Sequence, residues 1–245
     1  MNLLLFAQNE LRGDRLRLTD RRAAHIHDVL RAGPGDTLRV GMIGGKVGTG
    51  KITVLGPAMV ELQVRLHSPP PAKSGLELIL ALPRPVMLRR ILRQATVLGV
   101  SGFHLIRSRR VEKSYFQTPL LEPEKLRSLL LDGLSQAMDT VLPPVHVHTR
   151  FRPFVEDVLP GLTGSGLLAH PGAGDSLVRA WNRRKERLHV LLAVGPEGGW
   201  NDFEVEAFGR AGFVPFSMGS RILHVDTAVT ALLAQVHLLR DLESR

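Results

Sequence analysis

Apolar and polar residues alternate with a period of two along short runs in the first part of the chain. The clearest run is MVELQVRL at 59–66, in which every second residue from Val60 to Leu66 is apolar. This is the pattern of a strand with one buried face. Similar runs at 37–42 and 51–55, set off by turn glycines, and a short helix at 20–31 are also expected. Together these elements predict a small β-barrel.

The pattern changes after residue 75, where continuous apolar runs alternate with amphipathic segments of helical period. Strands buried on both faces read as continuous apolar runs, and they belong to mostly parallel sheets with helices on both faces. We therefore expect an α/β domain of this kind. Its strands are predicted at 76–82, 103–106, 145–147, 166–169, 188–194 and 213–216.

A proline-rich segment separates the two patterns. Three consecutive prolines, Pro69 to Pro71, can continue neither a sheet nor a helix, because proline fixes its φ angle and donates no backbone hydrogen bond. The sequence thus predicts a barrel at 1–68, a linker at 69–75 and the α/β domain at 76–245.

The charge of the chain favours a polyanionic partner. Lys and Arg number 32 against 23 Asp and Glu, a net charge of +9, and nucleic acid is a more common partner for such a chain than a membrane. Residues 1–150 carry 22 basic and 12 acidic side chains, whereas residues 151–245 carry 10 and 11. The excess of positive charge therefore lies in the first part.

A group of eight basic residues faces a single acid, Glu112. Part of it lies on the helix predicted at 85–99, whose apolar positions from Leu88 to Ala95 fall at i, i+3, i+4 and i+7 and leave the arginines on other faces. For one arginine a solvated surface position is the simpler interpretation, but the group indicates a phosphate-binding surface. Its members are Arg84, Arg89, Arg90, Arg93, Arg107, Arg109, Arg110 and Lys113.

The sequence contains no cysteine, which excludes disulfides and thiolate metal sites and fits a reducing compartment. The apolar run at 3–7 is too short for a signal peptide, and no run approaches a membrane span. We expect a cytoplasmic protein without a membrane segment. The ten histidines show no spacing typical of metal ligands, so no metal is expected.

The segment GKVGTGKI at 45–52 resembles a phosphate loop, but Ile52 stands where Ser or Thr would hold magnesium. A strand pattern follows it, whereas a phosphate loop opens a helix whose N-terminus faces the phosphates. We interpret the segment as a hairpin loop and expect no nucleoside triphosphate site there.

A loop almost free of side chains, Gly195-Pro196-Glu197-Gly198-Gly199, follows the apolar strand at 188–194. Asn201 and Glu204 have the spacing of a capping box, so a helix is expected to begin just after Trp200. Ligands of open α/β sheets bind at such carboxyl ends of strands, and the glycines would let a ligand approach the backbone. A tight strand-to-helix turn with incidental glycines accounts for the loop almost as well.

A second candidate loop, MGSRILHVDTA at 218–228, contains the polar residues Arg221, His224 and Asp226. Asp226 can cap the long helix expected at 227–239. That helix is apolar nearly all round, so it must be buried by the domain or by another copy of the chain.

The two loops and their surroundings, LLAVGPEGGWNDFEVEAF and MGSRILHVDTAVTALLAQV, with LLAHP at 167–171 upstream, resemble the RsmE-type 16S ribosomal RNA uridine-N3 methyltransferases of the SPOUT superfamily. The resemblance covers the whole chain. The segment HIHDVLR at 25–31 is similar to the PUA-like N-terminal barrel of that family, and LALPRPVMLRRILRQATVLGV to the first strand and helix of its catalytic domain.

The resemblance implies a C-terminal trefoil knot, a homodimer packed through the knot helices, and S-adenosyl-L-methionine bound in three loops at 168–171, 195–199 and 218–223. Backbone groups of these loops would hold the cofactor, which explains why the middle loop has so few side chains. The implied cofactor-binding residues are Leu168, Ala169, His170, Gly195, Pro196, Glu197, Gly198, Gly199, Met218, Gly219, Ile222, Leu223 and Thr227.

The resemblance also implies methylation of N3 of a uridine in small-subunit ribosomal RNA. That nitrogen must lose its proton and attack the methyl group in line with the departing sulfur, so alignment and stabilisation of the anion matter most. Arg221 is the candidate for holding a uracil oxygen or phosphate, and His224 or Asp226 for managing the proton. RNA contacts are expected at Arg22, Arg31, Arg84, Arg90, Arg109 and Arg110.

Glu197 has two candidate roles. Its carboxylate would favour the positive charge of a sulfonium or orient a neighbouring group, or it would accept hydrogen bonds from backbone N–H groups at a helix start.

Three motifs depart from the family pattern. The family's R-T-E-T-A is His224-Val225-Asp226-Thr227-Ala228 here, its E-Q-x-x-R keeps only Gln136, and its x-E-R is Ser108-Arg109-Arg110. Two alternatives therefore stay open: a divergent methyltransferase with another RNA target, or a non-catalytic RNA-binding or ribosome-assembly factor.

Overall fold

The computed structural model describes residues 2–244, which form two compact units. The first, which we call the N-terminal unit, contains the residues up to Ala72 and also Leu131–Leu142. The second, which we call the sheet unit, contains Lys73–Leu130 and the residues from Pro143 onward. The proline-rich segment at 69–75 has no helix or strand and includes the boundary after Ala72.

The N-terminal unit is built on a six-stranded sheet in the order β1-β4-β5-β6-β3-β2. β1 pairs with β4 in parallel, and the other neighbours are antiparallel. The strands predicted at 37–42, 51–55 and 59–66 lie within β4, β5 and β6, and the others add to them. The bounds are β1 (Leu4–Phe6), β2 (Leu11–Arg12), β3 (Arg15–Leu18), β4 (Thr37–Met42), β5 (Val47–Gly56) and β6 (Met59–Ser68).

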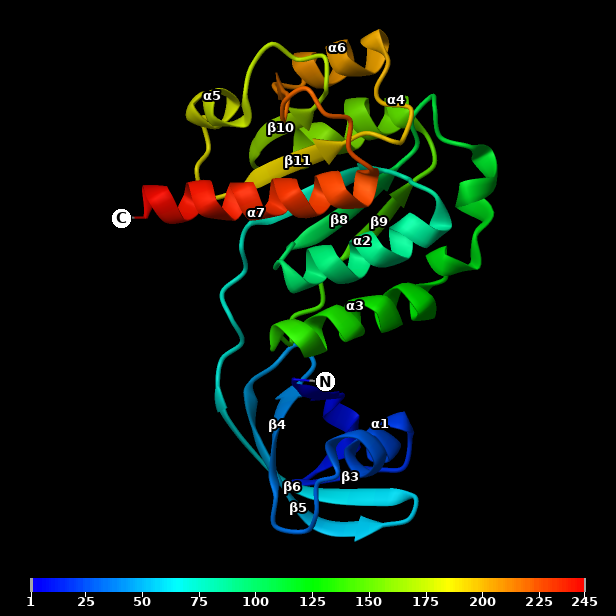
Figure 1. Ribbon diagram of the computed structural model, residues 1–245, viewed down its shortest axis with the longest axis vertical. Helices are drawn as coiled ribbons and strands as arrows, with labels where there is room; N and C mark the ends of the chain where they lie inside the picture. The colour runs from blue at the N-terminus through cyan, green and yellow to red at the C-terminus, as the bar shows by residue number, and fades with distance from the viewer. Residues whose placement is uncertain (1, 245) are drawn as a thin grey trace. The chain divides into compact units, whose positions relative to one another are not determined.

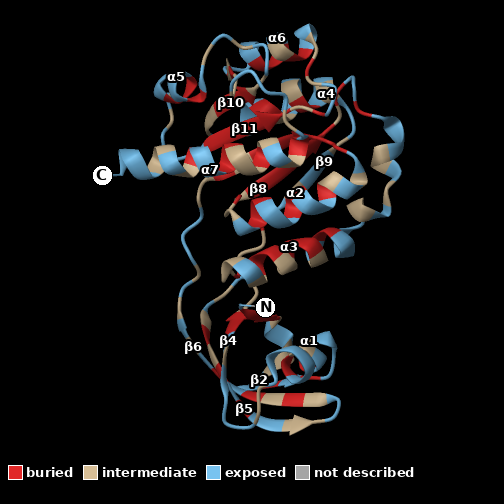
Figure 2. Cartoon of the chain, viewed as in Figure 1, coloured by how far each residue is buried: buried red, intermediate tan, exposed pale blue. Residues whose placement is uncertain are grey.

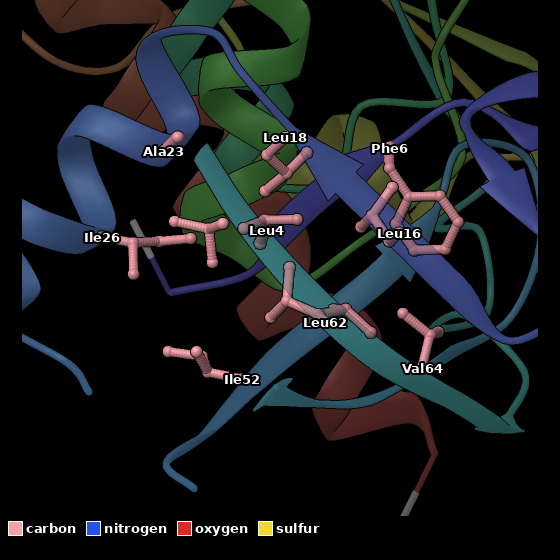
Figure 3. Close-up of a cluster of buried hydrophobic side chains, with 11 residues drawn as sticks. Leu4, Phe6, Leu16, Leu18, Ala23, Ile26, Ile52, Leu62 and Val64 are labelled. Atoms are coloured by element: carbon pink, nitrogen blue, oxygen red, sulfur yellow. The ribbon is translucent and has the colours of Figure 1, made fainter. Parts of the chain in front are cut away.

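Alternate residues of these strands meet in a hydrophobic core (Figure 3). Leu16, Leu18 and Leu62 are fully buried in it, as the period of two predicts for one face of a sheet. Ile26 joins them from the helical segment, which is an α-helix, α1 (Arg21–His25), followed by a π-helical turn (Ile26–Leu30). One helix was expected at 20–31, so the pattern gives its position but not the change of helix type.

Our interpretation of the segment at 45–52 as a hairpin loop is wrong, because β5 begins at Val47. A Cβ atom on Gly50 would lie 2.8 Å from Cγ1 of Val40 in β4, and one on Gly48 would collide with the carbonyl oxygen of Arg65 in β6. These glycines therefore allow neighbouring chain segments to pack closely.

The end of helix α3 (Pro123–Ala137) belongs to the N-terminal unit. The side chain of Leu134 packs against Leu3 and Leu5, and the Ser135 hydroxyl donates a 2.6 Å hydrogen bond to the carbonyl of Leu3. Just beyond the helix, Thr140 donates a 2.6 Å hydrogen bond to the carbonyl of Gly45. The divergent segment at 135–140 thus helps to complete the N-terminal unit.

The sheet unit contains six parallel strands in the order β12-β10-β11-β7-β8-β9. Each lies within two residues of a predicted strand, which confirms the expected mixed α/β fold with a parallel sheet. The bounds are β7 (Leu76–Ala81), β8 (Gly102–Ile106), β9 (Val145–His148), β10 (Ser165–Ala169), β11 (Val190–Val194) and β12 (Val214–Phe216).

Helices α2 and α7 lie side by side across one face of this sheet (Figure 1). The predicted stripe of α2 is buried from Leu88 to Ala95, and the arginines between these residues stay exposed. Figure 2 shows the buried strands beneath helices whose outer faces are exposed. Besides α1 and α3, the α-helices are α2 (Pro85–Val97), α4 (Phe151–Pro153), α5 (Leu177–Asn182), α6 (Asp202–Arg210) and α7 (Val225–Glu243).

Short turns complete the structure. They are 3₁₀ turns at Gln8–Glu10, Lys113–Gln117, Pro119–Leu121 and Leu159–Gly161, and a π-helical turn at Phe154–Val158. None of the helices formed by residues 2–244 is both long and apolar enough to cross a membrane.

Candidate active site

Three loops at the carboxyl ends of β10, β11 and β12 line one pocket of the sheet unit. Because all strands run in the same direction, these loops meet at one edge of the sheet, where ligands of α/β folds bind. The lining residues are Ala169, His170, Pro171, Val194, Gly195, Pro196, Glu197, Gly198, Gly199, Trp200, Phe216, Ser217, Met218, Gly219, Arg221, Ile222, Leu223, Val225, Ala228 and Leu232.

Eleven of the thirteen predicted cofactor-binding residues line this pocket. The two that do not are Leu168, which is fully buried within β10, and Thr227, which is exposed on the first turn of α7. The structure therefore brings together three loops that are far apart in the sequence, at 169–171, 194–200 and 216–223.

The most informative residue that the sequence did not mark is Trp200. Its indole is 3% exposed, and Nε1 donates a 3.2 Å hydrogen bond to the carbonyl of Ala169, which ties the first loop to the second. A Cβ on Gly195 would lie 3.2 Å from the same indole. Gly195 is thus required by close packing against Trp200, and a Trp directly after a Gly-rich loop was the signal available in the sequence.

Glu197 reaches back to the start of α2. Its Oε1 accepts a 3.2 Å hydrogen bond from the backbone N–H of Arg84, which is the N-cap residue of that helix and has no side-chain cap of its own. A carboxylate at this position satisfies a free N–H group and interacts favourably with the helix dipole. Glu197 therefore accepts a hydrogen bond at the start of α2, and not at the start of α6, the helix that directly follows its own loop.

Arg110 holds the loop from another side. Its guanidinium donates to the carbonyl of Gly198, and a Cβ on Gly198 would lie 3.1 Å from Cδ of Arg110. The next residue, Gly199, has a φ of +71°, a left-handed conformation that favours glycine. Close packing explains one glycine and backbone conformation the other.

Only one of the three predicted catalytic residues, Arg221, lines the pocket, and it is exposed. His224 is the exposed N-cap residue of α7. Asp226 lies in the first turn of α7, where Oδ2 is 3.5 Å from Nη1 of Arg90. The prediction that Asp226 caps this helix is wrong, since α7 begins one residue before it.

His170 offers the pocket an unused polar atom. Among the described residues, Nδ1 of His170 is buried and has no hydrogen-bond partner. A buried polar group of this kind usually finds a partner in water or a ligand.

The other predicted RNA contacts differ in their surroundings. Arg22 is bound by the carboxylates of Glu10 and Asp20. These carboxylates raise the pKa of the Arg22 guanidinium, and its hydrogen bonds lower the pKa of both carboxyl groups. The side chain of Arg31 is exposed, and its backbone has a left-handed conformation with a φ of 50°. The backbone N–H of Arg109 donates to Glu204 at 2.7 Å and leaves its side chain exposed.

A second polar cluster lies on β7, β8 and β9. Nε2 of His104 is 3.0 Å from Oε2 of Glu77, and its Nδ1 is 3.1 Å from Nε2 of His148. His146 stacks on His104 with ring centroids 5.2 Å apart. No group of three or more His, Cys, Asp or Glu residues in the range 2–244 has a geometry suited to a metal ion.

Comparison with known proteins identifies the family. The family model of the RNA methyltransferase domain matches residues 70–237. Ribosomal RNA small subunit methyltransferase E of Treponema pallidum is 32% identical over 242 residues, which cover 96% of this chain and 90% of that protein. The chain belongs to this RNA methyltransferase family.

A second relative of the same name and a solved structure also match most of this chain. The protein of the same name from Synechocystis is 29% identical over 225 residues, which cover 91% of this chain and 73% of that protein. The crystal structure of ribosomal RNA small subunit methyltransferase E from Neisseria gonorrhoeae, bound to S-adenosyl methionine, matches with a TM-score of 0.79. It is 22% identical and covers 98% of each chain.

Proposed function

We propose that this chain is an S-adenosyl-L-methionine-dependent methyltransferase that methylates N3 of a uridine in small-subunit ribosomal RNA. The observation that carries the proposal is the pocket formed by three loops at 169–171, 194–200 and 216–223. Family membership supports the transfer of a methyl group to RNA, and the named relatives support the ribosomal substrate.

The residues of the pocket fit this cofactor. Apolar side chains such as Trp200, Ile222 and Leu232 line it beside a glycine-rich loop, so an adenine ring and the backbone groups that bind it can both be accommodated. His170 also lines the pocket, and its unpartnered Nδ1 can supply a polar contact. When bound, the cofactor supplies an electrophilic methyl group on a positively charged sulfur.

Arg221 is the residue of this chain that we assign to the uridine, because it lines the pocket from the third loop. A guanidinium there stabilises the negative charge that N3 and the uracil oxygens develop. His224 and Asp226 lie just beyond, at the start of α7, and we propose them for the proton and for positioning Arg90, respectively. Basic residues Arg22, Arg31, Arg84, Arg90, Arg109 and Arg110 are proposed RNA contacts.

The N-terminal unit is proposed to be a PUA-like RNA-binding domain, and the end of the sheet unit to be knotted. We further propose a cytoplasmic homodimer that packs through α7. Two apolar side chains of this helix support the dimer, since Leu238 and Leu242 are 58% and 59% exposed in the single chain.

Two measurements test the function. Isothermal titration calorimetry with the cofactor and the full chain should show binding, and nucleoside mass spectrometry of small-subunit ribosomal RNA should show one N3-methyluridine that depends on the protein. Absence of cofactor binding, with RNA present, would overturn the proposal.

The altered motif at 224–228 favours one second candidate, a methyltransferase acting on another RNA position. The same mass spectrometry decides between them, because a methylated nucleotide other than N3-methyluridine would then appear. Binding of RNA without the cofactor would instead identify a non-catalytic RNA-binding factor.

A further inference from the structure

A second groove of the sheet unit lies at the carboxyl ends of β8 and β9. Three segments line it: the loop after β8, the turn that leads from β9 into α4, and the start of α6. The residues are Arg107, Ser108, Arg109, Val111, Lys113, Thr149, Arg150, Phe151, Arg152, Asn201, Phe203 and Glu204.

The charge of this groove is strongly positive. Five basic residues line it against one acid, Glu204. That carboxylate is buried and accepts hydrogen bonds from the backbone N–H groups of Arg109 and Asn201, at 2.7 and 3.1 Å. Within residues 2–244, no carboxylate forms an ion pair with any of the five basic side chains. Such a groove attracts phosphates.

An exposed aromatic ring lies in the same groove. The ring of Phe203 is 42% exposed, and the guanidinium of Arg152 is 5.2 Å from its centroid. Behind it, Phe151 is 6.2 Å from Phe203 and 5.7 Å from Phe208, which is buried. The ring therefore has Phe151 at its edge and the Arg152 guanidinium over its face, and enough of it stays exposed for an unpaired base to stack on it.

A buried hydroxyl without a partner gives independent support. Ser108 is 2% exposed, and among the described residues its Oγ has no hydrogen-bond partner. Buried polar groups rarely lack a partner in the functional state. Because Ser108 lines the groove, a base or phosphate oxygen bound there could satisfy it.

The groove continues the proposed cofactor pocket along one segment of chain. Gly195–Trp200 lines the pocket, and Asn201, Phe203 and Glu204, directly after it, line the groove. Arg110, from the loop after β8, donates to Gly198 between the two. A strand of RNA in the groove would thus pass close to the methyl donor.

We propose that this groove binds the single-stranded RNA next to the methylated nucleotide. Phe203 stacks on one unpaired base, while Arg107, Arg150 and Arg152 bind the phosphates beside it and Ser108 completes the contact. The inference rests on the proposed function for the identity of the RNA. It adds a base-stacking site at Phe203, a residue to which the sequence analysis assigned no role.

The test measures binding of a fluorescein-labelled ten-nucleotide oligouridylate to the full chain by fluorescence anisotropy at several salt concentrations. Replacing Phe203 by Leu should weaken binding roughly 5- to 150-fold, the range for loss of one base stack, without changing the salt dependence. Replacing Arg150 and Arg152 by Gln should reduce the slope of log affinity against log salt by about 1.4, or about 0.7 for each lost phosphate contact on a single strand.

The matched control is Lys185→Gln, which removes an exposed positive charge of the sheet unit outside the groove. Thermal unfolding verifies that each variant is folded. If the groove variants bind the oligouridylate as the control does, the inference is wrong. Binding of fluorescein-labelled polyglutamate without binding of the oligouridylate would likewise overturn it, in favour of an acidic peptide.

Cofactor titration of the same proteins keeps this inference separate from the proposed function. We expect the groove variants to bind S-adenosyl-L-methionine like the unmodified chain. If the unmodified chain binds the oligouridylate through Phe203 but does not bind the cofactor, the proposed enzyme is refuted and the RNA-binding groove is supported. If the chain binds the cofactor but the groove does not bind the oligouridylate, the groove is refuted and the proposed enzyme is supported.

Discussion

At the scale of single residues, the pocket depends on glycines, which have no Cβ atom and so leave room for neighbouring side chains. Gly195 has no Cβ because the Trp200 indole occupies that space, at 3.2 Å. The sequence marks the glycines, since several in one loop are unusual, but it cannot say which indole or arginine comes close to each. The separation of Ala169 from Trp200 along the chain hides their hydrogen bond from any local pattern.

Replacing Gly195 by Ala should therefore weaken cofactor binding. The new methyl group must displace the buried Trp200 by a few tenths of an ångström, and with it the hydrogen bond to Ala169. We expect a loss of roughly tenfold in affinity, about 1.4 kcal/mol, measured by calorimetry. Gly174→Ala is the control, because no other group lies within 4 Å of the place that its new methyl group would occupy. Equal affinities of the two variants would contradict the packing argument.

The hydrogen bond from the Arg84 N–H to Glu197 allows the two roles of this carboxylate to be separated. Glu197→Gln keeps an acceptor but removes the charge, whereas Glu197→Ala removes both. Because the observed contact needs only an acceptor, we expect cofactor affinity to stay within about twofold in the Gln variant, while the Ala variant loses about 1 kcal/mol of stability, as other lost helix caps do. A Gln variant that loses far more than twofold in cofactor affinity would show that the charge itself matters.

At the scale of elements, strands and caps were largely predictable because they depend on nearby residues. The capping box of Asn201 and Glu204 is present, with both hydrogen bonds formed. The pattern does not reveal that the Glu204 carboxylate also binds the N–H of Arg109, since that contact joins α6 to the loop after β8. Local sequence patterns therefore predict contacts within an element but not contacts between elements.

The cluster on β7, β8 and β9 makes stability depend on pH. Burial, followed by the nearby His104 and His146, lowers the pKa of His148 from 6.5 to about 4. Between these values the unfolded chain binds a proton that the folded chain does not, so stability falls as the pH drops from about 6.5 towards 4. The pKa of Glu77 is lowered chiefly by its hydrogen bond to His104, and its stabilising contribution is lost at still lower pH.

We therefore expect the melting temperature to fall less between pH 7 and about pH 4.5 in His148→Gln than in the unmodified chain. Glutamine keeps a hydrogen-bonding group beside His104 and has no proton to gain in this range. His67→Gln, at an exposed position of the N-terminal unit, should retain the full dependence. Parallel curves for all three proteins would show that His148 does not control the acid response.

At the scale of the whole molecule, the proline-rich segment predicts where one boundary lies but not that the chain returns. The N-terminal unit includes Leu131–Leu142, because Leu134 packs with Leu3 and Leu5. These partners are about 130 residues apart in the sequence, and no periodic pattern connects them. The divergent segment at 135–140 is thus explained in part by packing, through Ser135 and Thr140, and not by substrate contacts alone.

This arrangement predicts that a cut in the linker will not yield two well-folded parts. A fragment of residues 1–72 lacks Leu134, and its Leu3 and Leu5, which are at most 8% exposed in the full chain, would face water. We expect it to bind the dye ANS and to unfold without a sharp transition, because loss of a buried leucine alone destabilises a core by about 2–5 kcal/mol. Adding a peptide of residues 131–142 should reduce the dye binding, and the same peptide with Leu134 replaced by Asp should not. A fragment that unfolds cooperatively and ignores the peptide would show that the boundary after Ala72 is sufficient, and that the returning segment merely rests on a unit already complete.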